Sequence, residues 1–474
     1  MAQKLEKITA RDVDFAKWYT DVVKNAKLME YGQVKGTMIL KPNGFALWES
    51  MQNYLDKEFK TLGVQNVYFP LLIPESLFKK EKEHVEGFAP ELATVTMVGD
   101  KELSEKLYIR PTSEVLVADF LVNEIKSYRD LPIKYNQWVS VLRWEKTTRP
   151  FLRSSEFLWQ EGHTFHSTPS EAKKLTLDIL EIYKKFVQDV LLIPVLTGQK
   201  TDHEKFAGAK ETYTMESIMY DGQALQSGTS HYFDNNFSKA FNIKFQNSNQ
   251  KEEFAYSTSW GVSTRLIGAL IMTHGDDNGL IIPSKIAPKQ ITIITVNNSE
   301  EVVKKGNELL NSLKNIYRTT IDISDKSFGY KMAESEVEGT PLRIEVGPRD
   351  LAEGHVVISD RISNNKTKVM FNEVVSKIKE LLDEYDKNLR LRAWENFESK
   401  QFSANTFDEY KKIIQDTPGF VEVPFCGEIS CEDDIKKKSS TVSRCIKDFN
   451  TKNNEVCFNC NSQAKLHTYF ARAY

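Results

Sequence analysis

Two extended runs near the middle of the chain alternate so that charged and aromatic side chains share one face. If residues 133–145 form a strand, its period of two places four side chains on one side: Val139, Val141, Arg143 and Glu145. The same spacing in the next run collects four more: Phe157, Trp159, Glu161 and His163. A half-buried sheet usually separates apolar from polar faces. The pattern predicts a hairpin with a basic loop at residues 146–153, whose face is either an exposed surface or the floor of a ligand pocket.

Helical periodicity precedes this hairpin. Residues 9–29 are patterned as an amphipathic helix, and a short extended run follows at residues 38–40. Apolar residues then recur at helical spacing: Trp48, Met51, Leu55, Phe59 and Leu62. Gly63 ends this helix, and a strand is expected at residues 64–69, closed by Pro70. The apolar stripe fits packing in the core or an interface between subunits, and the pattern alone does not choose.

A strand ending near Tyr108 leads into a helix expected at residues 115–126. Thr112 and Ser113 stand where a helix cap belongs, and Glu114 falls in the first turn, where the positive end of a helix favours an acidic side chain. The same carboxylate, fixed at the end of an element, is also suited to hold an ammonium group. This segment alone favours the structural interpretation.

After a helix at residues 169–190, small hydrogen-bonding residues surround Gly228 in a turn expected at residues 226–231. Such a turn suits the close approach of a ligand, but it fits an ordinary loop equally well. His203 and His231 fit structural as well as functional roles.

A strand at residues 252–260 is followed by an apolar helix expected at residues 261–274, and Arg265 lies inside it. An unpaired buried charge is very costly, so Arg265 must either reach solvent or meet an anion. A structural carboxylate would satisfy it, and so would a phosphate group.

The pattern changes after Pro283 and Pro288. Strands expected at residues 290–296, 320–323, 342–346 and 355–359 alternate with helices expected at residues 299–317 and 372–385. This alternation is typical of a small α/β domain. A lysine-rich third unit follows, so we expect an α/β (α+β) protein of three units: residues 1–288, 289–388 and 389–474.

The third unit contains all five cysteines of the chain. Cys426 and Cys431 form one short-spaced pair, Cys457 and Cys460 form another, and Cys445 lies between the pairs. Each pair can present two sulfurs from one turn, which is typical of a tetrahedral thiolate zinc site. We expect a structural four-cysteine site, with Cys445 or His467 as the possible substitute ligand.

Composition excludes little. The chain has 63 basic and 66 acidic residues and a net charge of -3, so a polyanion must be met by local basic patches such as the 146–153 loop. The N-terminus lacks a hydrophobic signal core, and the most apolar helical stretch, residues 266–272, is too short to cross a bilayer. We therefore expect a cytoplasmic protein that does not bind membranes. The sequence has no phosphate-binding P-loop, no dinucleotide fingerprint and no strained nucleophile serine.

Taken together, these segments resemble the three motifs of class II aminoacyl-tRNA synthetases. Pro70 follows a long helix, Arg143 and Glu145 stand in a hairpin with a basic loop, and a strand leads into the Arg265 helix. Three runs narrow the resemblance to prolyl-tRNA synthetases of the archaeal and eukaryotic type: Arg-Pro-Thr-Ser-Glu at 110–114, Phe-Leu-Trp-Gln-Glu-Gly-His at 157–163 and Gln-Ser-Gly-Thr-Ser-His at 226–231. The hairpin and the Arg265 helix are too close in sequence for the editing domain that bacterial-type relatives insert between them.

The resemblance implies an antiparallel-sheet catalytic domain, a small α/β anticodon-binding domain and a C-terminal zinc-binding α/β domain. It implies ATP-dependent attachment of L-proline to tRNA(Pro) through a prolyl-adenylate, with Mg²⁺ at the phosphates and a structural Zn²⁺. It further implies a homodimer formed through the long helix that carries the stripe from Trp48 to Leu62 and through the strand after that helix.

The resemblance also implies roles for single residues. Arg143 and Arg265 would be catalytic. The ATP site would comprise Arg143, Glu145, Arg153, Ser154, Gln226, Thr229, Ser263 and Arg265. The proline site would comprise Thr112, Glu114, Arg143, Phe157, Trp159, Glu161, His163 and His231. The anticodon would be bound by Arg343, Glu345 and Arg349, and zinc by Cys426, Cys431, Cys457 and Cys460.

Three alternatives stand beside this interpretation. Another class II synthetase, such as the threonyl or histidyl enzyme, is disfavoured by residues 159–163 and by the cysteine-bearing tail. A catalytically silent paralogue that binds RNA or regulates another enzyme would not need the positioned charges of Arg143, Glu145 and Arg265. A zinc-dependent RNA-binding module explains the tail but not the hairpin.

Overall fold

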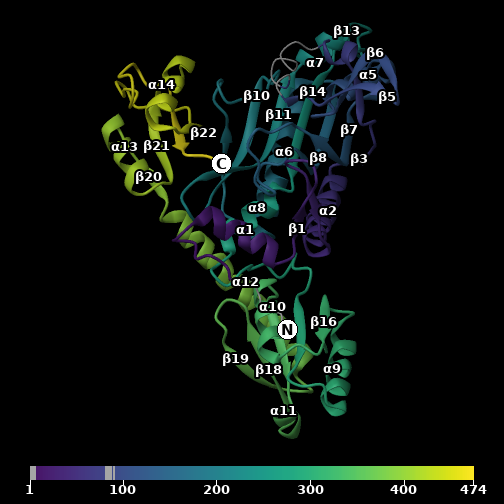
Figure 1. The fold of residues 1–474 in the computed structure, drawn as a ribbon. Coiled ribbons are helices and arrows are strands. Elements are labelled where there is room, and N and C mark those ends of the chain that lie inside the picture. The colour runs from purple at the N-terminus through teal and green to yellow at the C-terminus, as the bar shows by residue number, and fades with distance from the viewer. Residues whose placement is uncertain (1–6, 81–87, 89–90) are drawn as a thin grey trace.

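The computed structural model describes residues 7–80, 88 and 91–474. The N-terminal residues 1–6, where the sequence shows no signal core, lie outside the described residues. Figure 1 shows three parts: a large body built on a central sheet, a small α/β domain at its lower end and a C-terminal unit at its side. In the part of the chain that is described, no helix has both the length and the apolar character needed to cross a membrane.

Within the described residues, the central sheet has eleven strands in the order β20-β21-β23-β22-β9-β10-β11-β14-β8-β7-β3. Seven of them belong to the large body: β3 (Gln65–Asn66), β7 (Ile133–Leu142), β8 (Glu156–His166), β9 (Leu196–Gln199), β10 (Glu211–Ile218), β11 (Ala224–Asp234) and β14 (Tyr256–Ser263). Neighbours from β22 to β7 run antiparallel. The expected antiparallel catalytic sheet is therefore confirmed, and its hairpin is β7 and β8.

One face of this sheet is covered by helices. They are α1 (Phe15–Asn25), α2 (Pro42–Thr61), α6 (Pro169–Asp189) and α8 (Arg265–His274). Even-numbered residues of β7, β8, β14 and the later part of β11 face them, and Trp260 is 1% exposed. A Cβ atom on Gly162 would lie 2.0 Å from Cε2 of Trp260, so only glycine fits there. The odd-numbered residues of β7, β8, β11 and β14 consequently point to the opposite face.

A second layer packs at the end of the hairpin. It contains three-stranded and two-stranded pieces and short helices: β4 (Leu72–Pro74), β5 (Thr94–Val98), β6 (Lys101–Ile109), β12 (Lys244–Gln246), β13 (Glu252–Phe254), α3 (Glu75–Phe78), α5 (Glu114–Glu124), the 3₁₀ turn η2 (Tyr128–Asp130) and α7 (Asn236–Phe241). The smaller pair β1 (Met29–Tyr31) and β2 (Met38–Leu40) lies beside α2. Residues 167–264, all described, form parts of the sheet and of these layers, without a separate inserted domain.

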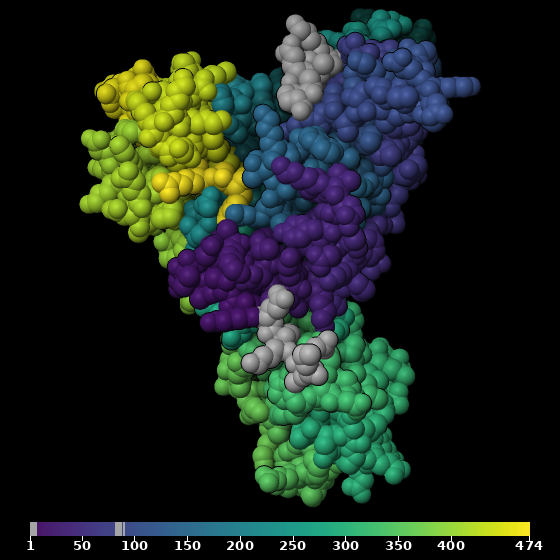
Figure 2. All heavy atoms as spheres, in the orientation of Figure 1, coloured from purple at the N-terminus to yellow at the C-terminus, as the bar shows by residue number. Residues whose placement is uncertain are grey.

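The small α/β domain has five described strands in the order β16-β15-β17-β18-β19. They are β15 (Ile291–Thr295), β16 (Thr319–Asp322), β17 (Leu342–Val346), β18 (His355–Asp360) and β19 (Lys366–Met370), with α9 (Glu300–Leu313), α10 (Phe328–Val337), α11 (Pro348–Ala352) and α12 (Val374–Glu398). Lys27 bonds Glu334 and Glu338 at 2.6 and 3.0 Å and so ties this domain to the large body. Figure 2 shows the N-terminal segment (purple) lying against that junction.

The C-terminal unit continues the central sheet. Its elements are β20 (Gln401–Ser403), α13 (Phe407–Asp416), β21 (Phe420–Phe425), α14 (Ile429–Ser439), β22 (Val442–Asp448) and β23 (Leu466–Ala471). β22 meets β9 where Ile446 pairs with Gln199. A Cβ atom on Gly198 would lie 2.3 Å from the Ile446 carbonyl oxygen, so a glycine is required at this join.

Several expectations were wrong in detail. Residues 226–231 lie in β11 and not in a turn, because Gly228 is packed between Met215 and Val262, whose methyl carbons would lie 2.7 and 2.8 Å from an added Cβ. The helix expected from residue 261 begins at Arg265, and residues 261–263 end β14. The strand expected at residues 64–69 is limited to β3, and the helix expected at residues 9–29 is limited to α1.

The closing helix of the α/β domain also runs further than expected. α12 does not end at residue 385 but continues to Glu398, across the expected boundary at residue 388. Its periodic buried residues explain this, because they continue from one unit to the next: Val374, Ile378, Leu382, Tyr385, Leu389, Ala393 and Phe397. The sequence also gave no indication of α10, α11 or β19.

Candidate active site

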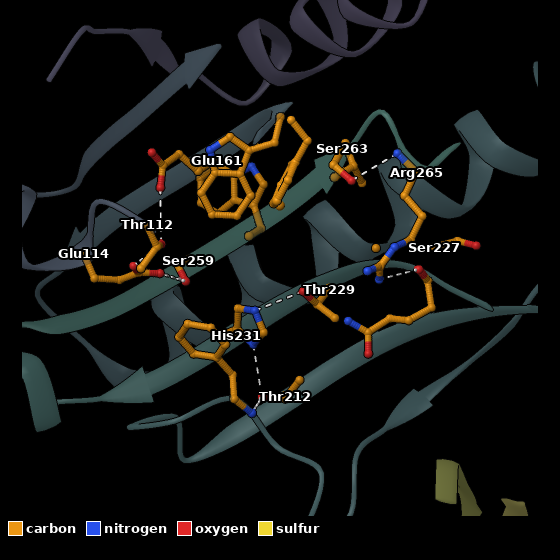
Figure 3. A pocket seen from close by; sticks show the side chains of 18 of the residues that line it. Thr112, Glu114, Glu161, Thr212, Ser227, Thr229, His231, Ser259, Ser263 and Arg265 are labelled. Carbon is orange, nitrogen blue, oxygen red and sulfur yellow. Dashed lines mark hydrogen bonds between the residues drawn. The ribbon is translucent and has the colours of Figure 1, made fainter. Parts of the chain in front are cut away.

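A cleft of about 190 Å³ opens on the face of the central sheet opposite α6. The strand register explains its lining, because Glu161 pairs with Gly261 and His163 with Ser259, and the next strand adds His231 opposite Ser259. Figure 3 shows Thr112, Glu114, Glu161 and Ser259 at one end, Ser263, Arg265 and Ser227 at the other, and Thr229 and His231 between them. The mixed face predicted for the hairpin is therefore a pocket floor, and the exposed-surface alternative is wrong.

Glu161 is the centre of a buried hydrogen-bond network at the first end. Its oxygens accept from Ser113 N at 3.0 Å, Ser113 Oγ at 2.6 Å and Gln137 Nε2 at 2.6 Å, and it contacts His163 Nε2 at 3.0 Å. Burial raises the pKa of Glu161, but these hydrogen bonds and the charge of His163 outweigh it and hold the pKa below its usual value. Burial likewise opposes charge on His163, yet the Glu161 partner raises the pKa of His163 above 6.5. The two side chains stabilise each other as an ion pair.

Glu114 begins α5 as expected, but the predicted hydroxyl cap is wrong. Ser113 is the N-cap residue and its side chain makes no cap hydrogen bond, because the hydroxyl donates to Glu161. Thr112 donates to Glu114, and Ser259 Oγ donates to the other oxygen of Glu114 at 3.2 Å. The Glu114 carboxylate thus lies at the positive end of a helix and at the edge of the cleft.

Arg143 follows β7 and lies between the two ends of the cleft. Its Nε donates to the Pro111 carbonyl at 3.1 Å, and its guanidinium carbon lies 5.1 Å from the Trp159 ring and 5.7 Å from the Phe157 ring. Burial lowers the pKa of Arg143. Over the described ranges, no carboxylate oxygen lies within 4.0 Å of its nitrogens. Arg143 is held by a carbonyl and by rings, so its charge remains available to an anion.

Arg265 is the first residue of α8 and lines the second end. Its Nε donates to the Leu152 carbonyl at 3.1 Å and its Nη1 to the Gln226 carbonyl at 3.5 Å. Burial, and repulsion from Arg143 and Arg153, lower the pKa of Arg265 to about 10. From the sequence, the partner of Arg265 was expected to be either a carboxylate or a phosphate group, unless the side chain reached solvent. The described structure provides no carboxylate within 4.0 Å, which favours an anionic ligand.

A second cavity continues from this end of the cleft and shares four lining residues with it: Arg143, Phe157, Ser263 and Arg265. Glu145, Arg153 and Ser154 also line it. Arg153 is about half exposed and lies 3.9 Å from Glu145. Three arginines from the hairpin and from α8 therefore surround one space, as a polyanionic ligand requires.

His231 lies in the middle of the floor. Thr212 Oγ1 lies 3.0 Å from its Nδ1, and Thr229 Oγ1 lies 3.0 Å from its Nε2. Burial and the charges of His163 and Arg143 lower the pKa of His231 to about 3, so it is neutral at physiological pH. The Phe206 ring packs at 4.4 Å from the imidazole. His231 is therefore an uncharged part of the pocket wall.

Some lining or supporting residues had not been recognised in the sequence: Gln137, Ser113, Ser259, Phe206 and Thr212. Gln137 was within reach of the pattern, because it shares the face of Val139 and Val141. Ser259 and Thr212 required the strand register, which no local signal gives.

The residues expected to bind the anticodon lie far from this cleft, in the α/β domain. Arg343 and Glu345 are buried on β17, and Arg349 is exposed on α11. Arg343 Nη2 donates to Asn364 Oδ1 at 2.9 Å, and Glu345 pairs with Lys366 at 3.0 Å. Nη1 of Arg343 and Oε1 of Glu345 are buried without a hydrogen-bond partner among the described residues.

The four expected cysteine ligands converge in the C-terminal unit. Their sulfurs all lie within 4.8 Å of one another, with Cys431 to Cys457 at 3.9 Å and Cys426 to Cys460 at 3.7 Å. Zinc bonds of about 2.3 Å in a tetrahedron place sulfurs about 3.8 Å apart, so the set fits zinc. Cys445 lies on β22 outside this set, and His467 pairs with Glu455 at 3.1 Å. Neither possible substitute ligand belongs to the cluster.

Comparisons with known proteins give the same picture. Residues 94–274 match the "tRNA synthetase class II core domain (G, H, P, S and T)", residues 290–381 the "Anticodon binding domain" and residues 407–474 the "Prolyl-tRNA synthetase, C-terminal" family. The chain is 60% identical to a proline--tRNA ligase of Mesoplasma florum, with all of both chains covered, and 50% identical to that of Clostridium novyi over 99% of this chain and 98% of the relative. It superposes with a TM-score of 0.95 on the crystal structure of prolyl-tRNA synthetase from Cryptosporidium parvum complexed with halofuginone and AMPPNP, at 39% identity, covering 99% of this chain and 100% of that one.

The antiparallel sheet with its arginine-lined cleft and the core-domain match define a class II aminoacyl-tRNA synthetase. Within that class, the full-length relatives and the C-terminal match show that the chain belongs to the prolyl-tRNA synthetase family. It is an enzyme that uses ATP to attach proline to tRNA(Pro) through a prolyl-adenylate, and the silent-paralogue alternative is not favoured.

Proposed function

We propose that Arg143 is the central catalytic residue and that it bridges the carboxylate of proline and the α-phosphate of ATP. The observation that carries this assignment is its position, because Arg143 lines both the cleft and the adjoining cavity. Two anions repel each other unless a cation lies between them, and a guanidinium can bond both at once. A carboxylate oxygen of proline would attack the α-phosphorus while the bond to pyrophosphate breaks. Positioning and charge stabilisation would carry the rate, with no protein nucleophile.

Arg265 would be the second catalytic residue and would hold the triphosphate together with Arg153. The other residues proposed to contact ATP also line the two cavities: Glu145, Ser154, Gln226, Thr229 and Ser263. Mg²⁺ bound with ATP would neutralise part of the phosphate charge. Glu145 supplies that side of the site with a carboxylate, the kind of oxygen ligand that Mg²⁺ prefers.

The first end of the cleft would bind proline. Thr112 and Glu114 would take the charged imino group, since a fixed carboxylate at the cleft edge complements a cation. The pyrrolidine ring would lie against the remaining residues of this end: Phe157, Trp159, Glu161, His163 and His231. Glu161 would act through its hydrogen bonds, which fix the floor on which the ring rests.

We further propose that Arg343, Glu345 and Arg349 contact the anticodon. The support is the pair of buried polar atoms, Nη1 of Arg343 and Oε1 of Glu345, that have no hydrogen-bond partner among the described residues, together with the exposed cation of Arg349. The units would be residues 1–288, 289–388 and 389–474, which is supported by family matches that fall inside the second and third units.

The C-terminal unit would bind one structural Zn²⁺ through Cys426, Cys431, Cys457 and Cys460. Asn459 Nδ2 donates to Cys431 Sγ at 3.3 Å, the kind of support that stabilises a bound thiolate. Elemental analysis of the purified enzyme is expected to find about one zinc per chain and its loss in Cys457→Ser. The matched control Cys445→Ser should keep the metal, and a metal-free, fully folded wild type would contradict the assignment.

The enzyme would be a cytoplasmic homodimer. The apolar stripe of α2 does not carry this proposal, because Trp48, Met51, Leu55 and Phe59 are all buried within the chain. The support comes instead from exposed apolar side chains on α2 and on the segments before and after it in sequence, namely Tyr31, Ile39, Phe45, Tyr68 and Leu71. Five free cysteines suit a reducing compartment.

Replacing Arg143 with alanine tests the central assignment. Arg143→Ala should lower ATP-pyrophosphate exchange with proline by about 100-fold to 1000-fold, because a preorganised cation at the reacting phosphate is lost. Binding of tRNA should not change. Trp144→Ala is the control, because Trp144 is the next residue in the chain and its side chain is 49% exposed. Wild-type exchange in Arg143→Ala would overturn the assignment.

A further inference from the structure

Beyond the nucleotide end of the cleft, three charged side chains form a buried cluster. Oε1 of Glu216, on β10, accepts from Lys200 Nζ at 2.9 Å and from Thr214 Oγ1 at 2.7 Å. Oε2 of the same carboxylate accepts from Arg444 Nε at 2.9 Å and from Arg444 Nη2 at 2.5 Å. Glu216 is 0% exposed, and both cations are buried. Both carboxylate oxygens therefore have partners, and two of the four hydrogen bonds come from one arginine.

Arg444 belongs to the C-terminal unit, whereas Glu216 and Lys200 belong to the catalytic body. Arg444 lies on β22, the strand that joins the central sheet beside β9. The join depends on Gly198, where any larger residue would collide with the backbone of β22. The C-terminal unit thus contributes one charged side chain to a buried cluster on the catalytic body.

The cluster lies next to the proposed phosphate site. Glu216 pairs in register with Gln226, whose carbonyl accepts from Arg265 Nη1 at 3.5 Å. The negative charge of Glu216 and the positive charge of Arg444 both act on the Arg265 guanidinium. Yet, in the part of the chain that is described, Arg265 has no carboxylate within 4.0 Å. Arg444 therefore pairs with a buried carboxylate whose charge reaches the arginine that faces the ligand.

We propose that Arg444 is a positioning residue for ATP: it holds Glu216 so that this carboxylate does not pair with Arg265, whose guanidinium then stays available to phosphate. The physical reason is that without Arg444 the Oε2 atom of this buried carboxylate loses both of its hydrogen bonds, while Lys200 and Thr214 satisfy only Oε1, so Oε2 is drawn to the next cation that feels its charge, Arg265. The inference rests on the phosphate-binding role proposed above for Arg265. It makes the C-terminal unit a contributor to nucleotide binding without any contact to the nucleotide.

The test uses the full-length, zinc-loaded enzyme and ATP-pyrophosphate exchange with proline. Arg444→Gln should raise KM for ATP about tenfold while KM for proline changes less than about twofold, because only the phosphate side loses a cation. Arg444→Lys keeps a positive charge on Glu216 and should restore most of the affinity. The double variant Glu216→Gln/Arg444→Gln should also recover ATP affinity, since no carboxylate remains to capture Arg265.

Lys447→Gln is the matched control, because Lys447 lies on the same strand and pairs with Glu422 at 2.5 Å in an exposed position. Its loss should leave both KM values unchanged. A wild-type KM for ATP in Arg444→Gln, an equal rise of both KM values, or a double variant no better than the single one would each overturn the inference. If Arg444→Gln fails to fold, the double variant and Glu216→Gln are measured instead. A raised KM for ATP in both of these variants contradicts the inference. A KM for ATP at or below that of the wild type supports it.

Arg265→Gln, measured in parallel, separates this inference from the proposed function. Weakened ATP binding in Arg265→Gln combined with normal binding in Arg444→Gln would overturn the positioning role alone. Unchanged ATP binding in Arg265→Gln would overturn the phosphate role of Arg265, and with it the basis of the inference.

Discussion

The two ends of the cleft differ in how their buried charges are balanced. At the end proposed to bind proline, the buried carboxylate of Glu161 accepts hydrogen bonds from Ser113 and Gln137 and pairs with His163. Arg265, at the end proposed to bind ATP, and Arg143, between the two ends, are held by backbone carbonyls, and no described carboxylate lies within 4.0 Å of either. The charge of Glu161 is therefore balanced within the protein, whereas the charge of the two arginines favours an anionic ligand.

This difference teaches how one floor serves two ligands. A small, mostly apolar amino acid offers few polar groups, so its site must be rigid by itself. A triphosphate brings several negative charges, so its site can keep excess positive charge and use the ligand as the counterion. Substitutions at the first end should therefore affect proline binding and folding, whereas substitutions at the second should affect mainly ATP.

The largest effect is expected at Glu114. Glu114→Gln should lower kcat/KM for proline in pyrophosphate exchange by about 100-fold to 1000-fold, because the imino cation loses its fixed carboxylate, while KM for ATP stays near that of the wild type. Glu124→Gln, at the exposed other end of α5, is the control. A larger loss of ATP affinity than of proline affinity would show that the two ends are assigned the wrong way round.

A smaller but still large effect is expected on stability at Glu161. Glu161→Gln leaves His163 buried without its ion-pair partner and should cost about 3 kcal/mol, measured as a lower unfolding temperature. The exposed Glu156→Gln on the same strand should change it little.

The pH dependence of that loss has a definite sign. The Glu161 contribution, from a lowered pKa, is present above about pH 4.5 and is lost as pH falls through the folded pKa. The His163 contribution, from a raised pKa, is present below about pH 6.5 and is lost as pH rises through its folded pKa. The difference in unfolding temperature between wild type and Glu161→Gln should therefore be larger at pH 6 than at pH 9, and an equal difference at both would contradict the ion pair.

The smallest effect is expected at Arg153, which is about half exposed. Arg153→Gln should raise KM for ATP about tenfold or less, with no change in unfolding temperature, because solvent screens this charge more than that of Arg265. Measuring KM at two salt concentrations tests the reason: the effect should shrink at high salt. Arg129→Gln, an exposed arginine outside the cleft, is the control.

The periodic part of this arrangement could be predicted from the sequence. Alternation placed Phe157, Trp159, Glu161 and His163 on one face, and the cost of an unpaired buried charge at Arg265 indicated an anion. The cysteine spacing identified the four sulfurs that converge. These signals are local, and local signals survive without tertiary information.

What the sequence did not show depends on distant neighbours. The strand at residues 226–231 is composed of residues that usually form turns, and it is extended because β10 and β14 pair with it on both sides. The hydroxyl of Ser113 donates to Glu161 because the fold brings that carboxylate beside it, whereas Thr112 donates to its sequence neighbour Glu114. The Glu216 cluster joins residues 228 positions apart, which no window of sequence reveals.

The continuous sheet has a practical consequence for anyone who trims this enzyme. Removing residues 400–474 would strip β22 from β9 and leave the short strand β9 as an uncovered sheet edge with open hydrogen-bonding groups at the rim of the catalytic body. Such an edge invites pairing with other chains, so a shortened catalytic fragment should aggregate unless that rim is covered. By covering this edge, the C-terminal unit thus also protects the catalytic body from self-association.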